Sequence, residues 1–164
     1  MKHCFSVILL GILILTSCTT VRVKQDDKDF TVTHDPPVRT RVHAEFEGRA
    51  YLIKNEDARA VRDSRAPDYS RIPAVGVIVL TFRGESTESA NPSNTVYILR
   101  DNTGKELYHG FGRDIEPTHR VAQGSITWYT TDRLYVTDES AEFPLTLHTS
   151  RQGRERVDIT ISRK

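Results

Sequence analysis

The stretch VGVIVLTF, residues 75–82, decides the fold of this chain, because it is the most apolar segment beyond the first 18 residues. It carries no charge and consists largely of β-branched side chains, which is typical of a central strand buried on both faces. The segment that follows it, 84–94, is rich in Ser, Asn, Gly and Pro and predicts a loop. We therefore expect the rest of the chain to supply neighbouring strands.

Shorter strand patterns follow downstream. Residues 95–100 and 106–111 flank the sequence DNTGK and predict a hairpin, since Asn and Gly accept the positive φ angles of a tight turn. Further strands are predicted at 126–131, 134–137, 143–149 and 156–162. Trp128 alternates with polar neighbours and is expected to lie in the core.

Upstream of the central segment, one strand is predicted at 30–33 and another over residues 38–47, where apolar and charged side chains alternate. Gly48 is interpreted as a bend or bulge, after which the strand continues over 50–53. This half of the chain then also favours β structure.

The segment 54–73 interrupts the strand patterns, because it is highly charged and has prolines at 67 and 73 near its end. Residues 56–65 are compatible with one or two helical turns. The alternative is a long surface loop, which is either functional or merely connecting. We interpret the segment as a connection and assign it no role.

These patterns predict an all-β fold, an antiparallel β-sandwich with Greek-key connections that is immunoglobulin-like in outline. A small β-barrel is the alternative. No predicted helix is long enough for the crossovers of a parallel sheet. The Cys–Trp–Cys signature of immunoglobulin domains is absent, since both cysteines lie within the first 18 residues. Residues 29–164 are expected to form one domain.

Composition excludes several classes of protein. The 164 residues contain 23 Lys and Arg against 22 Asp and Glu, a formal net charge of +1. This balance predicts no nucleic-acid partner, because such proteins usually carry a basic excess. The mean hydropathy of -0.46 is too low for a protein with many membrane spans.

The N-terminus has the pattern of an export signal. Residues 1–18 read MKHCFSVILLGILILTSC, with a positive charge at Lys2 and an apolar run that is too short to span a bilayer. The last four residues of this segment, LTSC, resemble the lipobox of bacterial lipoproteins, in which an aliphatic residue and two small residues precede the lipidated cysteine.

The resemblance implies that residues 1–17 are removed and that Cys18 receives fatty-acid chains, which anchor the protein to a membrane of the bacterial envelope. Residues 18–28 would then form the lipidated N-terminus and a flexible polar tether. Thr19 is not the Asp that favours inner-membrane retention in enterobacterial lipoproteins, so the outer membrane is the expected location.

No motif in the sequence predicts catalysis. The serines lack the G-x-S-x-G context of a nucleophile elbow, and beyond residue 18 no thiol exists. The histidines show none of the short spacings that typically bind zinc. We therefore predict no catalytic residue, no metal and no cofactor.

Two features are candidates for contact with a partner. The first is the sequence Tyr108-His109-Gly-Phe111-Gly-Arg113, where an aromatic side chain between glycines either is exposed or plugs the end of the sandwich. We favour the plug for Phe111. The second is an arginine excess, 17 Arg against 6 Lys, because guanidinium groups bind carboxylate and phosphate groups in a bidentate manner.

Arg39 and Arg41 are expected on one face of a strand, where they would bind an anionic partner or pair with acids across the sheet. Taken together, the sequence predicts a lipid-anchored, non-catalytic binding module for a protein, glycan or envelope partner. A structural subunit of an envelope assembly is the alternative, and an enzyme with an unrecognised site is a third hypothesis.

Overall fold

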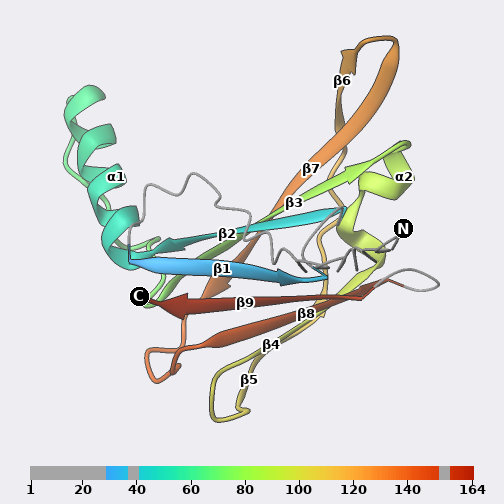
Figure 1. The fold of residues 1–164 in the computed structure, drawn as a ribbon. Coiled ribbons are helices and arrows are strands. Elements are labelled where there is room, and N and C mark those ends of the chain that lie inside the picture. Colours follow the sequence, from blue (N-terminus) through green and yellow to red (C-terminus); the bar gives the residue numbers. More distant parts are fainter. Residues whose placement is uncertain (1–28, 37–40, 152–155) are drawn as a thin grey trace, which may run out of the picture.

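The computed structural model of the chain describes residues 29–36, 41–151 and 156–164, which form two packed antiparallel β-sheets and three short or medium helices (Figure 1). One sheet has the strand order β1 (Phe30–Asp35), β9 (Val157–Arg163), β8 (Leu145–Arg151), β4 (Thr95–Arg100), β5 (Glu106–Phe111). The other has the order β2 (Val42–Gly48), β3 (Gly76–Gly84), β7 (Ser125–Val136), β6 (Thr118–Ala122). The helices are α1 (Arg49–Arg62), α2 (Thr87–Ala90) and the 3-10 helix η1 (Pro92–Asn94).

The strand order confirms the predicted sandwich and its immunoglobulin-like outline. After β1, the chain forms the pairs β2–β3, β4–β5, β6–β7 and β8–β9, which alternate between the two sheets. The order β2-β3-β7-β6 matches strands A-B-E-D of an immunoglobulin domain, and β5-β4-β8-β9 matches C′-C-F-G. Strand β1 adds to the edge beside β9, and neither sheet closes into a barrel.

Strand β3 is the central strand that its sequence predicts. It pairs with β2 on one side and with β7 on the other, so that Ile78 lies between Phe46 and Leu134. The four residues Val77, Ile78, Val79 and Leu80 are all buried, which means that both faces of β3 are covered. The inner face packs against apolar side chains of the opposite sheet, such as Leu147 and Ile159.

Helix α1 replaces the predicted extension of the strand over 50–53, which is wrong. Gly48 pairs with Gly76 as the last residue of β2 and then serves as the N-cap of α1. The helix has 14 residues, longer than the one or two turns expected. Its residues Leu52, Asn55, Glu56 and Arg59 follow the spacing that places side chains on one helical face.

Ser64 ends this helix in the left-handed conformation, with a φ angle of 51°. The Arg65 N–H donates to the carbonyl of Ala60, and the Ser64 N–H donates to that of Val61. These two bonds form a Schellman motif, which usually has glycine at the left-handed position. The sequence therefore lacked the glycine that normally indicates a helix end.

The β6–β7 hairpin differs from the prediction as well. The strands predicted at 126–131 and 134–137 are one strand of 12 residues, and β6 was not predicted. The hairpin extends beyond the sandwich at the end opposite α1 (Figure 1). Trp128 is half-buried there and contacts the ring of His119, with centroids 4.8 Å apart and an interplanar angle of 49°, so its predicted place in the core is wrong.

A pair of histidines joins the two sheets near the start of β2. The rings of His34 on β1 and His43 on β2 stack with centroids 5.3 Å apart, and His34 Nε2 accepts the Ala44 N–H at 2.9 Å. Burial lowers the pKa of His34, and the neighbouring His43 lowers it further. Burial also lowers the pKa of His43, against the opposite effect of Glu45 and together with that of Arg83.

This pair predicts a loss of stability in mild acid. The ordinary histidine pKa is about 6.5. Near and below this pH, His34 and His43 bind protons more readily in the unfolded chain than in the folded protein, so the free energy of unfolding falls as the pH falls. We expect the urea midpoint of the wild-type chain to decrease when the pH is lowered from 7.5 to 5.5. The midpoint of His34→Gln should decrease less. The exposed His119→Gln is the control. Equal pH dependence in wild type and His34→Gln would contradict this account.

Candidate binding site

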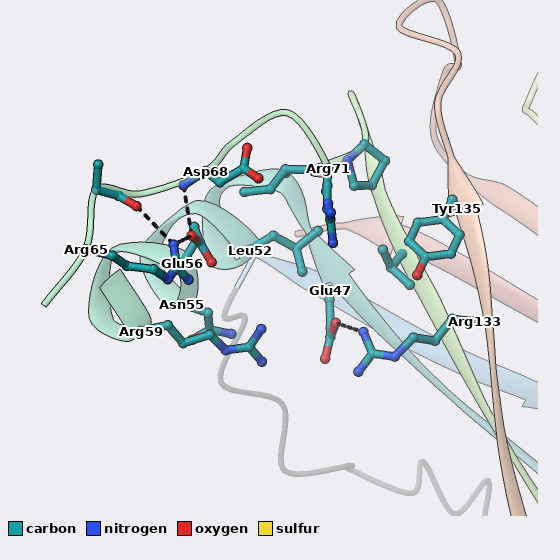
Figure 2. A pocket seen from close by; sticks show the side chains of 14 residues that line it. Glu47, Leu52, Asn55, Glu56, Arg59, Arg65, Asp68, Arg71, Arg133 and Tyr135 are labelled. Carbon is teal, nitrogen blue, oxygen red and sulfur yellow. Dashed lines mark hydrogen bonds and ion pairs between the residues drawn. The ribbon is translucent and has the colours of Figure 1, made fainter. Parts of the chain in front are cut away.

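A groove lies between α1, the segment that follows it, and the outer face of the β2-β3-β7 sheet (Figure 2). Its volume is about 650 Å³, which is within the range of small-molecule sites. We call it the α1 groove. It is lined by Glu47, Leu52, Asn55, Glu56, Arg59, Arg65, Ala66, Asp68, Arg71, Ile72, Pro73, Val77, Arg133 and Tyr135.

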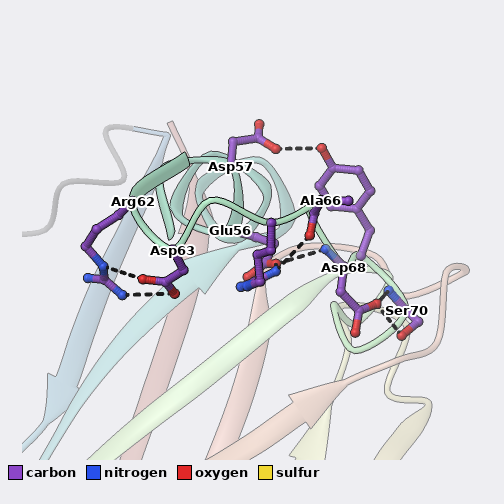
Figure 3. Close-up of polar contacts among 9 residues, drawn as sticks. Glu56, Asp57, Arg62, Asp63, Ala66, Asp68 and Ser70 are labelled. Atoms are coloured by element: carbon purple, nitrogen blue, oxygen red, sulfur yellow. Dashed lines mark hydrogen bonds and ion pairs between the residues drawn. The ribbon is translucent and has the colours of Figure 1, made fainter. Parts of the chain in front are cut away.

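The segment after α1 is fastened to the helix and to the sheet. Glu56 accepts a hydrogen bond from Arg65 Nη1 at 2.6 Å and another from the Asp68 N–H at 2.9 Å (Figure 3). The Tyr69 hydroxyl donates to Asp57 at 2.5 Å. At the start of the helix, Arg49 donates to the carbonyls of Ile72 and Pro73. This wall of the groove is therefore preformed.

The acids of this wall accept hydrogen bonds from neighbouring residues. Hydrogen bonds from Arg65 and from the Asp68 backbone hold the pKa of the Glu56 carboxyl below its usual value. The Ser70 hydroxyl and N–H donate to Asp68 and lower its pKa in the same way. On the opposite wall, Glu47 pairs with Arg133 at 3.2 Å. All three carboxylates that line the groove thus have a partner.

Two arginines of the groove are not hydrogen-bonded to its acids. Within the described ranges, the side chains of Arg59 and Arg71 form no hydrogen bond or close ion pair, although they lie near Asp63 and Asp68 respectively and add to the hydrogen bonds that lower the pKa of these carboxyls. Arg65 and Arg133, in contrast, each bind an acid directly. Figure 2 shows Arg59, Arg71 and Arg133 extending toward the hollow from three sides. Asn55 and Tyr135 add an amide and a hydroxyl to the lining. Chemically, the site offers donors and positive charge.

The partner contacts predicted from the sequence lie elsewhere, along the edge strand β5 of the other sheet. Phe111 is 66% exposed, so the interpretation that it plugs the end of the sandwich is wrong. His109 is exposed and lies 3.3 Å from Glu106. The Tyr108 hydroxyl donates to the carbonyl of Phe111. These residues form one exposed edge, separate from the α1 groove.

The predicted arginines have different places. Arg113 Nε donates to the buried Asp132 at 2.6 Å, so this guanidinium contributes to the structure. Arg41 precedes β2, which begins at Val42, so its predicted place on a strand face is wrong. It is exposed and lines a second hollow with Arg151. Arg39 and Cys18 fall outside the described residues, as do the segments 1–17 and 18–28.

No local sequence motif indicates the α1 groove. Arg59 and Arg71 belong to the segment interpreted as a connection, and Arg133 is 62 residues away from Arg71 in the chain. The arginine excess was the only indication of an anion site. The groove exists because 54–62 is helical and packs against β2 and β3, with side chains of β7 completing the lining.

No known family model, curated protein or solved structure matches this chain. In the part of the chain that the structure describes, no three His, Cys, Asp or Glu side chains are grouped as a metal site would require. No helix among the same residues combines the length and apolar character of a membrane span. The function must therefore be inferred from the site itself.

Proposed function

We propose that this chain is a bacterial envelope lipoprotein, anchored through Cys18, that acts as a non-catalytic binding module for a protein, glycan or other envelope partner. The observation that carries the proposal is the α1 groove, a preformed hollow with donor groups on a rigid sandwich. The lipobox-like sequence LTSC supports the anchor. Thr19 favours the outer membrane.

The anchor has a direct test in Cys18→Ala. In a bacterial host fed a fatty-acid analogue, the wild-type chain should take up the label and sediment with membranes. Cys18→Ala should lose the label and most of the membrane association, because the acyl chains that hold the chain at the bilayer are missing. Cys4→Ala is the matched control, since this cysteine precedes the predicted cleavage site. A wild-type chain without label would disprove the anchor.

The exposed tip of the β6–β7 hairpin favours a second candidate, a structural subunit of an envelope assembly. Val121 and Ile126 face each other across the hairpin and are 67% and 52% exposed. Every residue of β6, an edge strand of its sheet, is exposed. Exposed apolar side chains beside the open edge of a strand are typical of contact with another chain. A stoichiometric partner retained after mild detergent extraction would favour this role.

A further inference from the structure

The charges of the α1 groove define the kind of ligand that fits it. Its lining carries four arginines and three acids, a formal excess of one positive charge. The acids already accept hydrogen bonds from Arg65, Arg133 and Ser70. Arg59 and Arg71 therefore have donors to offer, and an anion between them would gain charge-assisted hydrogen bonds.

The shape of this donor set favours a tetrahedral anion. One guanidinium group satisfies a planar carboxylate through two parallel N–H bonds. In the α1 groove, two free guanidinium groups approach from different elements, Arg59 from α1 and Arg71 from the segment after it (Figure 2). A phosphate group has oxygens pointing in several directions and can accept bonds from both.

We infer that Arg59 and Arg71 bind a phosphate group in the α1 groove, either on a lipid headgroup or on a soluble phosphate ester. The inference rests on the proposed function as a binding module, and the lipid source rests also on the anchor. Asn55 and Tyr135 are placed in the same lining to donate further hydrogen bonds.

The position of the groove makes a headgroup accessible. Asp29, the first described residue, lines a hollow together with Arg49, Ala50 and Ile53 of α1, so the start of β1 and the start of α1 lie at the same end of the sandwich (Figure 1). Eleven residue steps separate Cys18 from Asp29 and span at most about 40 Å. Helix α1 is about 21 Å long. An anchor at Cys18 therefore leaves the groove within reach of the headgroup layer.

The binding test uses the full chain, purified in a neutral detergent and titrated with glycerol phosphate by calorimetry. We expect saturable binding to the wild-type chain that weakens about tenfold or more in the double variant Arg59→Gln/Arg71→Gln. Arg62→Gln is the matched control. It removes the same charge from the same helix, but Arg62 pairs with Asp63 and does not line the groove, so binding should change less than about twofold.

Three results would overturn the inference: no saturable binding to the wild-type chain, equal weakening by Arg62→Gln, or acetate binding as tightly as phosphate. Because Arg59 and Arg71 are exposed, the double variant should keep its circular dichroism spectrum. If it does not fold, competition at the wild-type chain decides, since sulfate should displace glycerol phosphate and acetate should not.

An experiment with vesicles distinguishes the two sources of the phosphate group, a lipid headgroup and a soluble phosphate ester. The full chain is placed in vesicles of phosphatidylcholine alone or mixed with phosphatidylglycerol, and its unfolding temperature is measured. A higher temperature with phosphatidylglycerol, absent in the double variant, supports the headgroup. Binding of glycerol phosphate without this effect supports the soluble ester. Because the calorimetry is done in detergent, a missing acyl label would disprove the anchor without affecting phosphate binding.

Discussion

Asp132→Ala is expected to lower the free energy of unfolding by about 3 kcal/mol, because several donors lose one buried acceptor together. Asp132 lies on β7 and is 2% exposed. Its carboxylate accepts the Tyr97 hydroxyl at 3.2 Å, Arg113 Nε at 2.6 Å, and the N–H groups of Arg113 and Arg133 at 3.1 and 2.8 Å. For a domain of this size, the unfolding temperature should fall by roughly 10 °C.

Most of the lost stability is expected to come from the buried groups that lose their hydrogen-bond acceptor. The Arg113 side chain is 58% exposed, so water can solvate its charge once the carboxylate is gone. Tyr97 is buried, and its hydroxyl would have no comparable replacement. Burial, together with the charge of Asp132, also raises the pKa of Tyr97 well above its usual value, which keeps this hydroxyl a donor.

Urea denaturation of the full chain in mild detergent measures the effect. Asp132→Asn keeps one acceptor oxygen and should lose less stability than Asp132→Ala. Asp114→Ala is the control, since this acid is exposed and accepts one bond from Asn91. If Asp132→Ala were as stable as Asp114→Ala, the hydrogen bonds to the buried carboxylate would contribute little to stability, contrary to this expectation.

Much of the sandwich was predictable because apolar and polar side chains alternate along most of its strands. The hairpin 95–100 and 106–111 has the bounds predicted from the sequence, since Gly104 provides the positive φ angle that such a turn needs. The uncharged segment 75–82 was correctly predicted as a strand covered on both faces, as the burial of Val77 to Leu80 shows. In both places the local sequence and the tertiary structure favour the same conformation.

The sequence indicated only the second half of helix α1, where helical turns were compatible with residues 56–65, and not its first half. Its sequence Tyr51-Leu52-Ile53 is apolar and β-branched in part, and continues directly from β2. Gly48 provides no side-chain cap, and Ser64 takes the place of a C-terminal glycine. The helix instead depends on tertiary contacts, including the bonds from Arg49 to the carbonyls of Ile72 and Pro73.

The candidate site was even less accessible to sequence analysis. A buried acid such as Asp132 looks like any exposed acid in the chain, and only the fold shows that Arg113 is bound to it. Likewise, Arg62 and Arg65 each form an ion pair with an acid, whereas Arg59 and Arg71 lie near Asp63 and Asp68 without a hydrogen bond to them. Which arginine is free depends on packing, and no local motif encodes it.

Phe46→Ala is expected to cost about 3–5 kcal/mol of stability, because it removes a fully buried aromatic ring from the core. The ring meets Phe30 edge-on with centroids 4.7 Å apart and Phe143 with centroids 5.8 Å apart. Phe46 belongs to β2, whereas Phe30 begins β1 in the other sheet. The cluster thus joins the two sheets at the end of the sandwich where β1 begins.

Phe111→Ala is a matched control, since it is the same chemical change at a side chain that is 66% exposed. It should alter stability by less than about 0.5 kcal/mol, because a surface substitution leaves no cavity. Phe46→Leu should lie between the two, since a smaller cavity remains. Urea midpoints of the three variants should therefore rank Phe111→Ala, Phe46→Leu, Phe46→Ala from highest to lowest. A Phe111→Ala variant as unstable as Phe46→Ala would mean that Phe111 is a core residue after all and that β5 packs differently.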